Sequence, residues 1–439
     1  MKQYNAKKIL NIALAGHGGC GKTSVAESMI YLAKASERLG NIADGNTVLD
    51  YDSEEIKRQT SILTSVAPIE WKNTKINIID TPGLFDFEGG VAEGMRAADS
   101  ALIVVSGKDG VNVGTAPNFR QALARKAGRF MGRTLDPETD MVVTIGSTEA
   151  MVDTIFALTN PGDKIIMFSP YFENYRAQAI MADCEPVFVP LVPPEFNFDA
   201  NVLEDAFKQG AKAILICNPS NPSGKVFTYD ELKLISELCI KYDAFAIMDE
   251  VYKHIVYDGH KHIYMNSLPG MWERTVSCSS LSKTYSITGW RLGYAIAPQP
   301  IMDRIKQYHD FNTVGAPSPL MEAAVVGLDM PDSYYQEFGA HYAHMKKLFT
   351  DGLKQIGIPF TDPQGAYFVL ADIGPYMRKG ESDVDFCLEM AEKVGVACVP
   401  GTSFFNENIN HIVRVHFAKK DETLYEALER LSHLKEKMG

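Results

Sequence analysis

The stretch SSLSKTYSITGWRLGY, residues 279–294, places a lysine, an arginine and several hydroxyl groups directly after an apolar strand. Lys283 stands in a serine-rich turn, and Arg291 follows it on the way to the next apolar run. A lone lysine in a loop is usually solvated, so this stretch needs support from elsewhere in the chain. The segment AFAIMDEVY, residues 244–252, supplies this support. Asp249 lies at the end of an apolar strand, and a carboxylate buried there requires a cationic partner.

These three side chains together meet the chemical needs of one cofactor. A lysine forms a Schiff base with an aldehyde, an aspartate pairs with a protonated pyridine nitrogen, and an arginine with serines binds a phosphate. Pyridoxal phosphate carries all three groups. The combination of Lys283, Asp249 and Arg291 therefore predicts a pyridoxal-phosphate site at the ends of buried strands.

The chain from about residue 116 onward alternates apolar strands with helical stretches. This alternation predicts an α/β fold with a mostly parallel sheet and helices on both faces. Ligands bind at the carboxyl ends of such strands, and the predicted strand ends carry polar or aromatic residues. Three of these ends read GSTEA (146–150), SPYFENY (169–175) and NPSNPSG (218–224).

These motifs stand in the order found in the class I and II aminotransferases of pyridoxal-phosphate fold type I, which residues 117–439 resemble. The resemblance implies a large cofactor-binding domain over residues 116–328 and a small α/β domain over 329–439. The stretch before the helix at NFRQALARK, where the family carries an N-terminal segment of its own, is unlike that segment.

The resemblance also implies roles for individual residues. Lys283, Asp249 and Tyr252 are the implied catalytic residues, and Arg414 in HIVRVHFA is the implied clamp for the substrate α-carboxylate. The implied cofactor-binding residues are Ser147, Thr148, Phe172, Asn221, Asp249, Tyr252, Ser280, Lys283 and Arg291. The alternatives are a core aromatic for Phe172, a turn residue for Asn221 and a solvated strand residue for Arg414.

The implied reaction moves an amino group between an α-amino acid and a 2-oxo acid. A lyase outcome on the same cofactor stays open, because reaction type depends on substrate orientation. The family builds its site across a two-fold interface, so the resemblance implies a homodimer, weakened here by the missing N-terminal arm.

The beginning of the chain has a different character. GHGGCGKT, residues 16–23, lies between an apolar strand and a helix, as a phosphate-binding P-loop requires, and INIIDTPG, residues 76–83, delivers Asp80 to a second strand end. Residues 9–115 resemble the G domain of elongation factor G-like translational GTPases. The implied nucleotide-binding residues are Gly16, His17, Gly18, Gly19, Cys20, Gly21, Lys22, Thr23, Asp80 and Gly83, with GTP as ligand and Mg²⁺ held by Thr23 and Ser61.

This GTPase-like segment, residues 1–115, is predicted to be truncated. Leu84 stands where the family has a histidine that orients water, and the Asn-Lys-x-Asp string that reads guanine does not occur. The segment GKDGVNVGTAPNFRQALARKAG, residues 107–128, runs from one family into the other. A GTP-binding protein related to translation factors and a gene fusion without function are the alternatives to an aminotransferase. The more complete set of cofactor residues favours the enzyme.

Composition and charge argue against several other classes of protein. The 439 residues carry a formal net charge of −12, which argues against a general nucleic-acid or anionic-membrane binder. Seven scattered cysteines form no zinc or disulfide pattern and fit the cytoplasm. No apolar run approaches the length that would span a bilayer.

Overall fold

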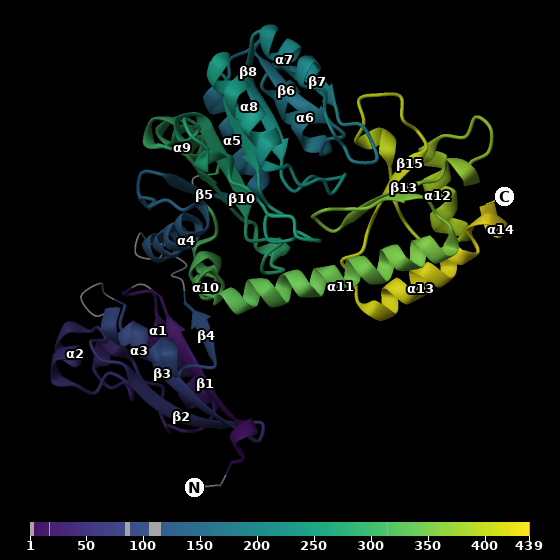
Figure 1. Ribbon diagram of the computed structural model, residues 1–439. Helices are drawn as coiled ribbons and strands as arrows, with labels where there is room; N and C mark the ends of the chain where they lie inside the picture. Colours follow the sequence, from purple (N-terminus) through teal and green to yellow (C-terminus); the bar gives the residue numbers. More distant parts are fainter. Residues whose placement is uncertain (1–3, 17, 84–87, 105–115, 314, 439) are drawn as a thin grey trace. The chain divides into compact units, whose positions relative to one another are not determined.

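The computed structural model describes residues 4–16, 18–83, 88–104, 116–313 and 315–438 (Figure 1). The chain divides into two compact units, which we call the first and the second unit. The first comprises Met1–Gln121 with Ser318–Val326, and the second comprises Ala122–Pro317 with Gly327–Gly439. Helices α4 (Ala116–Met131) and α10 (Ser318–Leu328) each contain residues of both units.

The first unit contains a four-stranded sheet in the order β2-β3-β1-β4. β1 pairs in parallel with β3 and β4, whereas β2 is antiparallel to β3. Ala26 and Ile30 of helix α1 pack with Leu14 and Ile78 of the sheet in one apolar cluster. The elements are β1 (Ile9–Ala15), α1 (Lys22–Leu32), α2 (Ser53–Arg58), β2 (Ser65–Trp71), β3 (Thr74–Asp80), α3 (Glu88–Ala97) and β4 (Ser100–Ile103).

Strand β4 is the edge of this sheet within the described residues. The P-loop sheet predicted from the sequence is therefore present up to its fourth strand. The predicted junction at residues 115–116 adjoins the segment 105–115, which lies outside the described residues.

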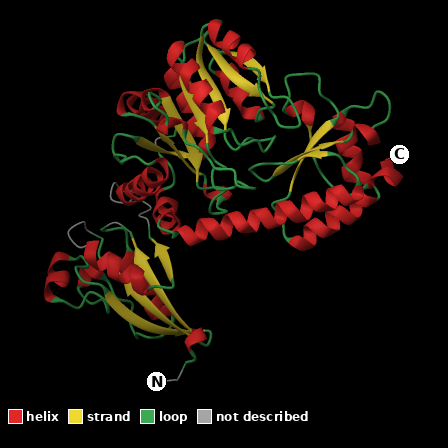
Figure 2. Cartoon of the chain, viewed as in Figure 1, coloured by secondary structure: helices red, strands yellow, loops and turns green. Residues whose placement is uncertain are grey.

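The second unit is built on a seven-stranded sheet in the order β5-β11-β10-β9-β8-β6-β7 (Figure 2). Only β11 runs against its neighbours β5 and β10, and the other pairs are parallel. The strands are β5 (Met141–Ile145), β6 (Lys164–Ser169), β7 (Glu185–Pro190), β8 (Ala211–Cys217), β9 (Phe245–Asp249), β10 (Thr275–Ser280) and β11 (Leu292–Ile296). The helices around this sheet are α5 (Gly146–Leu158), α6 (Glu173–Met181), α7 (Ala200–Lys208), α8 (Tyr229–Lys241) and α9 (Gln299–Asn312).

Both faces of this sheet are buried, because helices pack against the side chains that point to each face. In β6, Ile166 packs in a cluster with residues of α7 and α8, whereas Ile165 and Met167 pack with residues of α5, α6 and α9. Figure 1 shows helices on the two sides of the strands. The α/β fold predicted from the alternating pattern is confirmed.

The C-terminal part of the second unit contains a smaller antiparallel sheet in the order β12-β13-β15-β14. The long helix α11 packs against α13 beside it (Figure 1). The elements are α11 (Asp332–Ile356), β12 (Phe360–Thr361), β13 (Phe368–Asp372), α12 (Asp383–Lys393), β14 (Val399–Pro400), β15 (Ile412–His416), α13 (Asp421–Ser432) and α14 (Leu434–Met438). This sheet brings β15, with Arg414, to the functional site described below.

Among the described helices, none combines the length and the apolar character that crossing a membrane would need.

Candidate active site

A cavity of about 540 Å³ in the second unit gathers side chains from the large sheet and from β15. All ten residues predicted for cofactor and substrate line it, namely Ser147, Thr148, Phe172, Asn221, Asp249, Tyr252, Ser280, Lys283, Arg291 and Arg414. Most of them follow or end strands whose carboxyl ends meet at one edge of the sheet. The cavity brings together all ten of these residues, which are far apart in sequence. Their individual roles stay predictions.

Asp249 ends β9, the central strand, and is buried. Its carboxylate accepts a hydrogen bond from the Tyr175 hydroxyl at 2.6 Å and one from the Val251 backbone N–H at 3.2 Å. Burial raises the pKa of Asp249 to about 6, although these two hydrogen bonds and the positive charge of Lys283 act in the opposite direction. A carboxylate held this way is suited to pair with a cation inside the cavity.

Lys283 lies in the segment between β10 and β11 and is half-buried. Its Nζ lies 5.7 Å from the centre of the Tyr367 ring. Within the described part of the chain, no hydrogen bond or ion pair occupies the amine. Lys283 therefore presents an amine to the same cavity that Asp249 lines.

Arg291 and the start of α5 line the cavity next to each other. The Gly146 backbone N–H donates to the Arg291 carbonyl oxygen at 2.8 Å. Gly146 has a φ of 72°, and a Cβ on it would lie 2.1 Å from Arg291 Nη2. The positive φ favours glycine here, and the absence of a Cβ lets the guanidinium lie against the helix N-terminus. The positive end of the α5 dipole and the guanidinium together suit an anion such as a phosphate.

Arg414 reaches the cavity from β15 and is half-buried. Its guanidinium lies over the rings of Phe368 and Phe404, at 4.6 and 4.5 Å from their centres, and Nη1 donates to Asn221 Oδ1 at 2.6 Å. The alternative of a solvated strand residue does not fit these contacts. Asn221 is likewise buried at the cavity wall and bonded across to β15.

Aromatic residues form much of the remaining wall. Phe172 is half-buried at the N-cap of α6, and Tyr252 packs edge-on against Tyr367 and Phe368. Burial raises the pKa of Tyr252, so its hydroxyl is neutral and can donate a hydrogen bond. The sequence analysis did not identify Tyr367, although it occurs in GAYFVL, residues 365–370.

Tyr175 and His416 are among the other lining residues that the sequence analysis missed. Tyr175, which donates to Asp249, lies in the quoted stretch SPYFENY, three residues after Phe172. That spacing on a helix could have placed both on one face. His416 follows Arg414 by two positions on β15, and the period of a strand places both on the same face, which the sequence could also have indicated.

The P-loop in the first unit has the backbone that its glycines predict. Gly16, Gly19 and Gly21 have φ values of 149°, 78° and 95°, and Lys22 Nζ donates to the Gly16 carbonyl oxygen at 2.8 Å. The Gly18 N–H donates to the Gly83 oxygen at 2.7 Å, which brings the two predicted nucleotide motifs together. His17 and Leu84 lie outside the described residues, whereas Cys20 is described.

The residues predicted to bind Mg²⁺ are also adjacent. The Thr23 hydroxyl donates to Asp80 Oδ2 at 2.6 Å and lies 3.0 Å from the Ser61 hydroxyl. Asp80 Oδ1 is buried without a hydrogen-bond partner among the described residues. Burial raises the pKa of Asp80 to about 6, against the effect of the Thr23 hydrogen bond. These oxygen atoms have the chemistry that Mg²⁺ prefers.

Two family models match the chain. The model described as aminotransferase class I and II matches residues 91–431, and the one described as elongation factor Tu GTP binding domain matches residues 7–131. The first match begins earlier than the resemblance at residue 117, and the two overlap over residues 91–131. The predicted boundary at 115–116 lies inside this overlap and stays a prediction.

Individual relatives are aminotransferases. The chain is 32% identical over 376 residues to the probable N-succinyldiaminopimelate aminotransferase DapC of Mycobacterium tuberculosis, covering 83% of this chain and 94% of that protein. It is 32% identical over 346 residues to kynurenine–oxoglutarate transaminase 1 of Homo sapiens, covering 72% and 82%. The solved structure of N-succinyldiaminopimelate aminotransferase from Mycobacterium tuberculosis matches with a TM-score of 0.69 at 34% identity, covering 72% of this chain and 83% of that one.

Replacing Tyr175 by Phe tests the electrostatics of Asp249. The substitution removes the 2.6 Å hydrogen bond that favours the ionised carboxylate, so the pKa of Asp249 rises above about 6. A hydrogen bond to a charged group corresponds to a shift of about 1 unit or more. Infrared difference titration of the carboxyl band would measure it, with Tyr308→Phe on the exposed face of α9 as control. An unchanged pKa would contradict the role given to this hydrogen bond.

Proposed function

Because this chain belongs to the class I and II aminotransferase family, we propose that the cavity of its second unit binds pyridoxal phosphate and substrate through the ten residues predicted from its sequence. The chain is accordingly an aminotransferase, which moves an amino group between an amino acid and a 2-oxo acid. The assignment of residues rests on one observation. The buried Asp249 carboxylate lines the same cavity as Lys283 and Arg291.

The residues present fit the three polar groups of this cofactor. Pyridoxal phosphate, when bound, supplies an aldehyde that condenses with amines and a protonated pyridine ring that accepts electrons. Lys283 offers the amine for the aldehyde, and Asp249 offers the buried carboxylate that keeps a proton on the ring nitrogen. Tyr252 and Asn221 are available to donate hydrogen bonds to the ring oxygen, and Phe172 offers a face for stacking.

The phosphate is assigned to Arg291 and the start of α5. Arg291 supplies a fixed positive charge there, and Ser147, Thr148 and Ser280 supply hydroxyl groups. Ser147 and Thr148 lie in the first turn of α5, where the helix dipole favours an anion. The Cβ-free surface of Gly146 leaves the space that this arrangement needs.

Lys283 and Arg414 are assigned to the substrate. The Lys283 amine, when it is not bound to the cofactor, is the base that takes the α-proton of the amino acid and later returns a proton. Arg414 carries the guanidinium that binds the α-carboxylate in a bidentate fork, and its two aromatic neighbours hold the side chain in place. Burial lowers the pKa of Arg414, but the group stays cationic at neutral pH.

Trapping the cofactor tests the assignment of Lys283. Borohydride reduction of the purified protein, followed by peptide mass spectrometry, should place a pyridoxyl group on Lys283. The Lys283→Ala variant should carry no adduct, whereas Lys233→Ala on the exposed face of α8 should label as the parent protein does. An adduct on a different lysine would refute the assignment.

Substitution of Arg414 tests the substrate clamp. Arg414→Ala should raise the KM for the amino acid by about 10- to 100-fold, since charge-assisted hydrogen bonds to the α-carboxylate are lost. The cofactor absorbance should remain. Arg430→Ala on α13, a half-exposed arginine, serves as control. Loss of the cofactor with an unchanged KM would assign Arg414 to the cofactor instead.

We also propose that residues 1–115 form a nucleotide-binding segment, followed by the large domain over 116–328 and the small domain over 329–439. The contacts of Lys22, Thr23, Ser61 and Asp80 support a site for a triphosphate with Mg²⁺. GTP is the ligand that the elongation factor resemblance suggests. The missing guanine-reading string argues that the base contributes little to affinity.

Nucleotide titration tests this second site. The full-length protein should bind GTP and ATP weakly and with similar affinity in the presence of Mg²⁺. Lys22→Ala should remove this binding, because the P-loop loses its cation, whereas the exposed control Lys57→Ala should not. Tight binding selective for GTP would show that the missing motif has been replaced.

Assembly and location are proposed from the resemblance and from composition. We propose a homodimer, because the family shares its site across a two-fold interface. We propose a cytoplasmic location, since all seven cysteines are free. Sedimentation velocity and cell fractionation test the two statements, and a strict monomer with full activity or a secreted protein would contradict them.

A further inference from the structure

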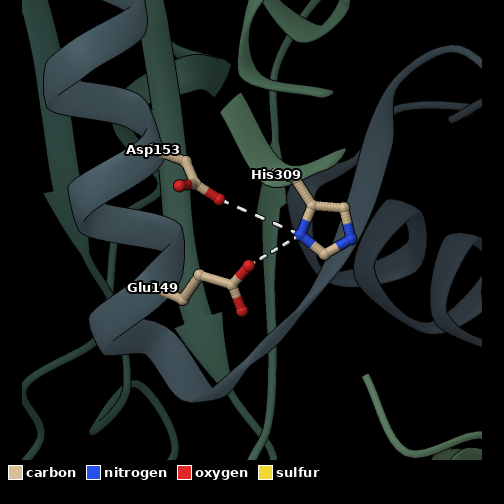
Figure 3. Close-up of side chains that lie close together, drawn as sticks. All are labelled: Glu149, Asp153 and His309. Atoms are coloured by element: carbon tan, nitrogen blue, oxygen red, sulfur yellow. Dashed lines mark hydrogen bonds and ion pairs between the residues drawn. The ribbon is translucent and has the colours of Figure 1, made fainter. Parts of the chain in front are cut away.

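Three buried titratable residues lie beside the proposed phosphate site. Glu149 and Asp153 belong to α5, and His309 belongs to α9 (Figure 3). Glu149 directly follows Thr148, so a carboxylate stands next to the hydroxyl groups assigned to the phosphate. The three side chains are 8%, 0% and 7% exposed, which leaves little solvent to screen their charges.

Contacts join these residues to the start of α5. His309 Nδ1 lies 2.7 Å from Glu149 Oε1 and 3.9 Å from Asp153 Oδ2. The other Glu149 oxygen accepts the backbone N–H of Ile145, the N-cap residue of α5. The Thr313 hydroxyl donates to Glu149 Oε1 at 2.5 Å. Glu149 therefore ties α9 to the turn that begins the helix.

The charges of this cluster favour a protonated histidine. Burial by itself would lower the pKa of His309, but its hydrogen bond to Glu149 and the nearby carboxylates outweigh burial and raise it. Burial would raise the pKa of Glu149, but hydrogen bonds from His309, Thr313 and Ile145 lower it. Burial raises the pKa of Asp153 to about 6, even though Asn312 donates to this carboxylate at 2.6 Å.

We propose that His309, as an imidazolium between Glu149 and Asp153, neutralises the acidic start of α5 and so positions this helix to bind the cofactor phosphate. His309 is thus a positioning residue, because it acts through Glu149 and α5. Without its charge, the Glu149 carboxylate would repel a phosphate dianion at the neighbouring turn. This inference rests on the proposed function.

The inference predicts a pH dependence with a definite sign. The charged groups that face His309 are Glu149 and Asp153 from α5, and Asp310 lies on its own helix. The imidazolium is lost as the pH rises through its raised pKa, so phosphate affinity falls in that range. Gln keeps a hydrogen-bond donor without the charge, and a His309→Gln variant should lack this component of the pH profile.

Titration of the apoprotein with pyridoxal phosphate and with pyridoxal tests the inference. His309→Gln should raise the Kd for pyridoxal phosphate about 10-fold and leave the Kd for pyridoxal unchanged, because only the phosphate senses the lost charge. The double variant His309→Gln with Glu149→Gln should regain affinity for the phosphate form. His344→Gln, an exposed histidine on α11, is the control.

The outcomes separate the inference from the proposed function. Equal weakening of both ligands, or no weakening, in a protein whose Lys283 still takes the cofactor would overturn the role of His309 alone. A double variant that remains as weak as His309→Gln would also overturn it. Failure of the parent protein to bind pyridoxal phosphate at Lys283 would overturn both proposals.

A second and independent observation concerns two cysteines in the small domain. Cys387 on α12 and Cys398, directly before β14, place their sulfur atoms 3.1 Å apart. Cys387 is buried and Cys398 is half-buried. Asp383 of α12 also accepts hydrogen bonds from the Thr402 N–H and hydroxyl, at 2.8 and 3.1 Å. The Asp383–Thr402 contact therefore joins the two segments close to the thiols.

We infer that Cys387 and Cys398 form an intramolecular disulfide when the protein meets a small-molecule disulfide such as oxidised glutathione. The Cys398 thiol donates a hydrogen bond to the Cys387 sulfur and so lowers the pKa of Cys387, which as thiolate attacks one sulfur and releases one glutathione thiolate. Cys398, as thiolate, then displaces the second glutathione thiolate. Two protein thiols are thereby oxidised, the small disulfide is reduced to two thiols, and the two protein protons pass to the leaving thiolates.

Peptide mapping without reduction tests this site. After incubation with oxidised glutathione, the peptides containing Cys387 and Cys398 should be linked, with a mass about 2 Da below their sum. Dithiothreitol should restore both thiols. Cys398→Ser should abolish the link, whereas the buried control Cys239→Ser should retain it. A persistent mixed disulfide on either cysteine, or two unmodified thiols, would overturn the inference.

Discussion

The buried carboxylate of Asp249 is the constraint on which the functional site depends. A carboxylate in an apolar interior is costly unless a cation or several donors compensate it. Asp249 ends the central strand β9, between β8 and β10, with apolar clusters on both faces of the sheet. Tyr175 and the Val251 N–H supply two hydrogen bonds, and the remaining compensation has to come from the cavity.

The other parts of the site are arranged around this requirement. Parallel strands deliver their carboxyl ends to one edge, so Lys283 and the start of α5 open onto the same cavity as Asp249. The antiparallel strand β11 begins at Leu292, paired with Ile145, and this pairing sets Arg291 against Gly146. β15 contributes Arg414 to the same cavity. A ligand with a cationic ring and an anionic tail would pair its ring with Asp249 and its tail with Arg291.

Sequence reasoning succeeded where the signal was local. A few neighbouring residues are enough to recognise the strand ends, the P-loop glycines and the Lys283 segment. The structure brings the predicted residues together. It failed for contacts that only tertiary structure creates. Glu149 and His309 are 160 positions apart, and nothing local in the sequence pairs them. Residues 318–326 belong to the first unit although they follow its other residues by about 200 positions, which no local pattern could show.

The central claim is that Asp249 holds a proton on the cofactor ring nitrogen. The most direct measurement is ¹⁵N NMR of the holoenzyme loaded with pyridoxal phosphate labelled at the ring nitrogen. A shift typical of a protonated pyridine from pH 7 to 8.5, lost in Asp249→Asn, is the predicted result. An unprotonated nitrogen in the parent protein, or a protonated one that persists in Asp249→Asn, would contradict the account.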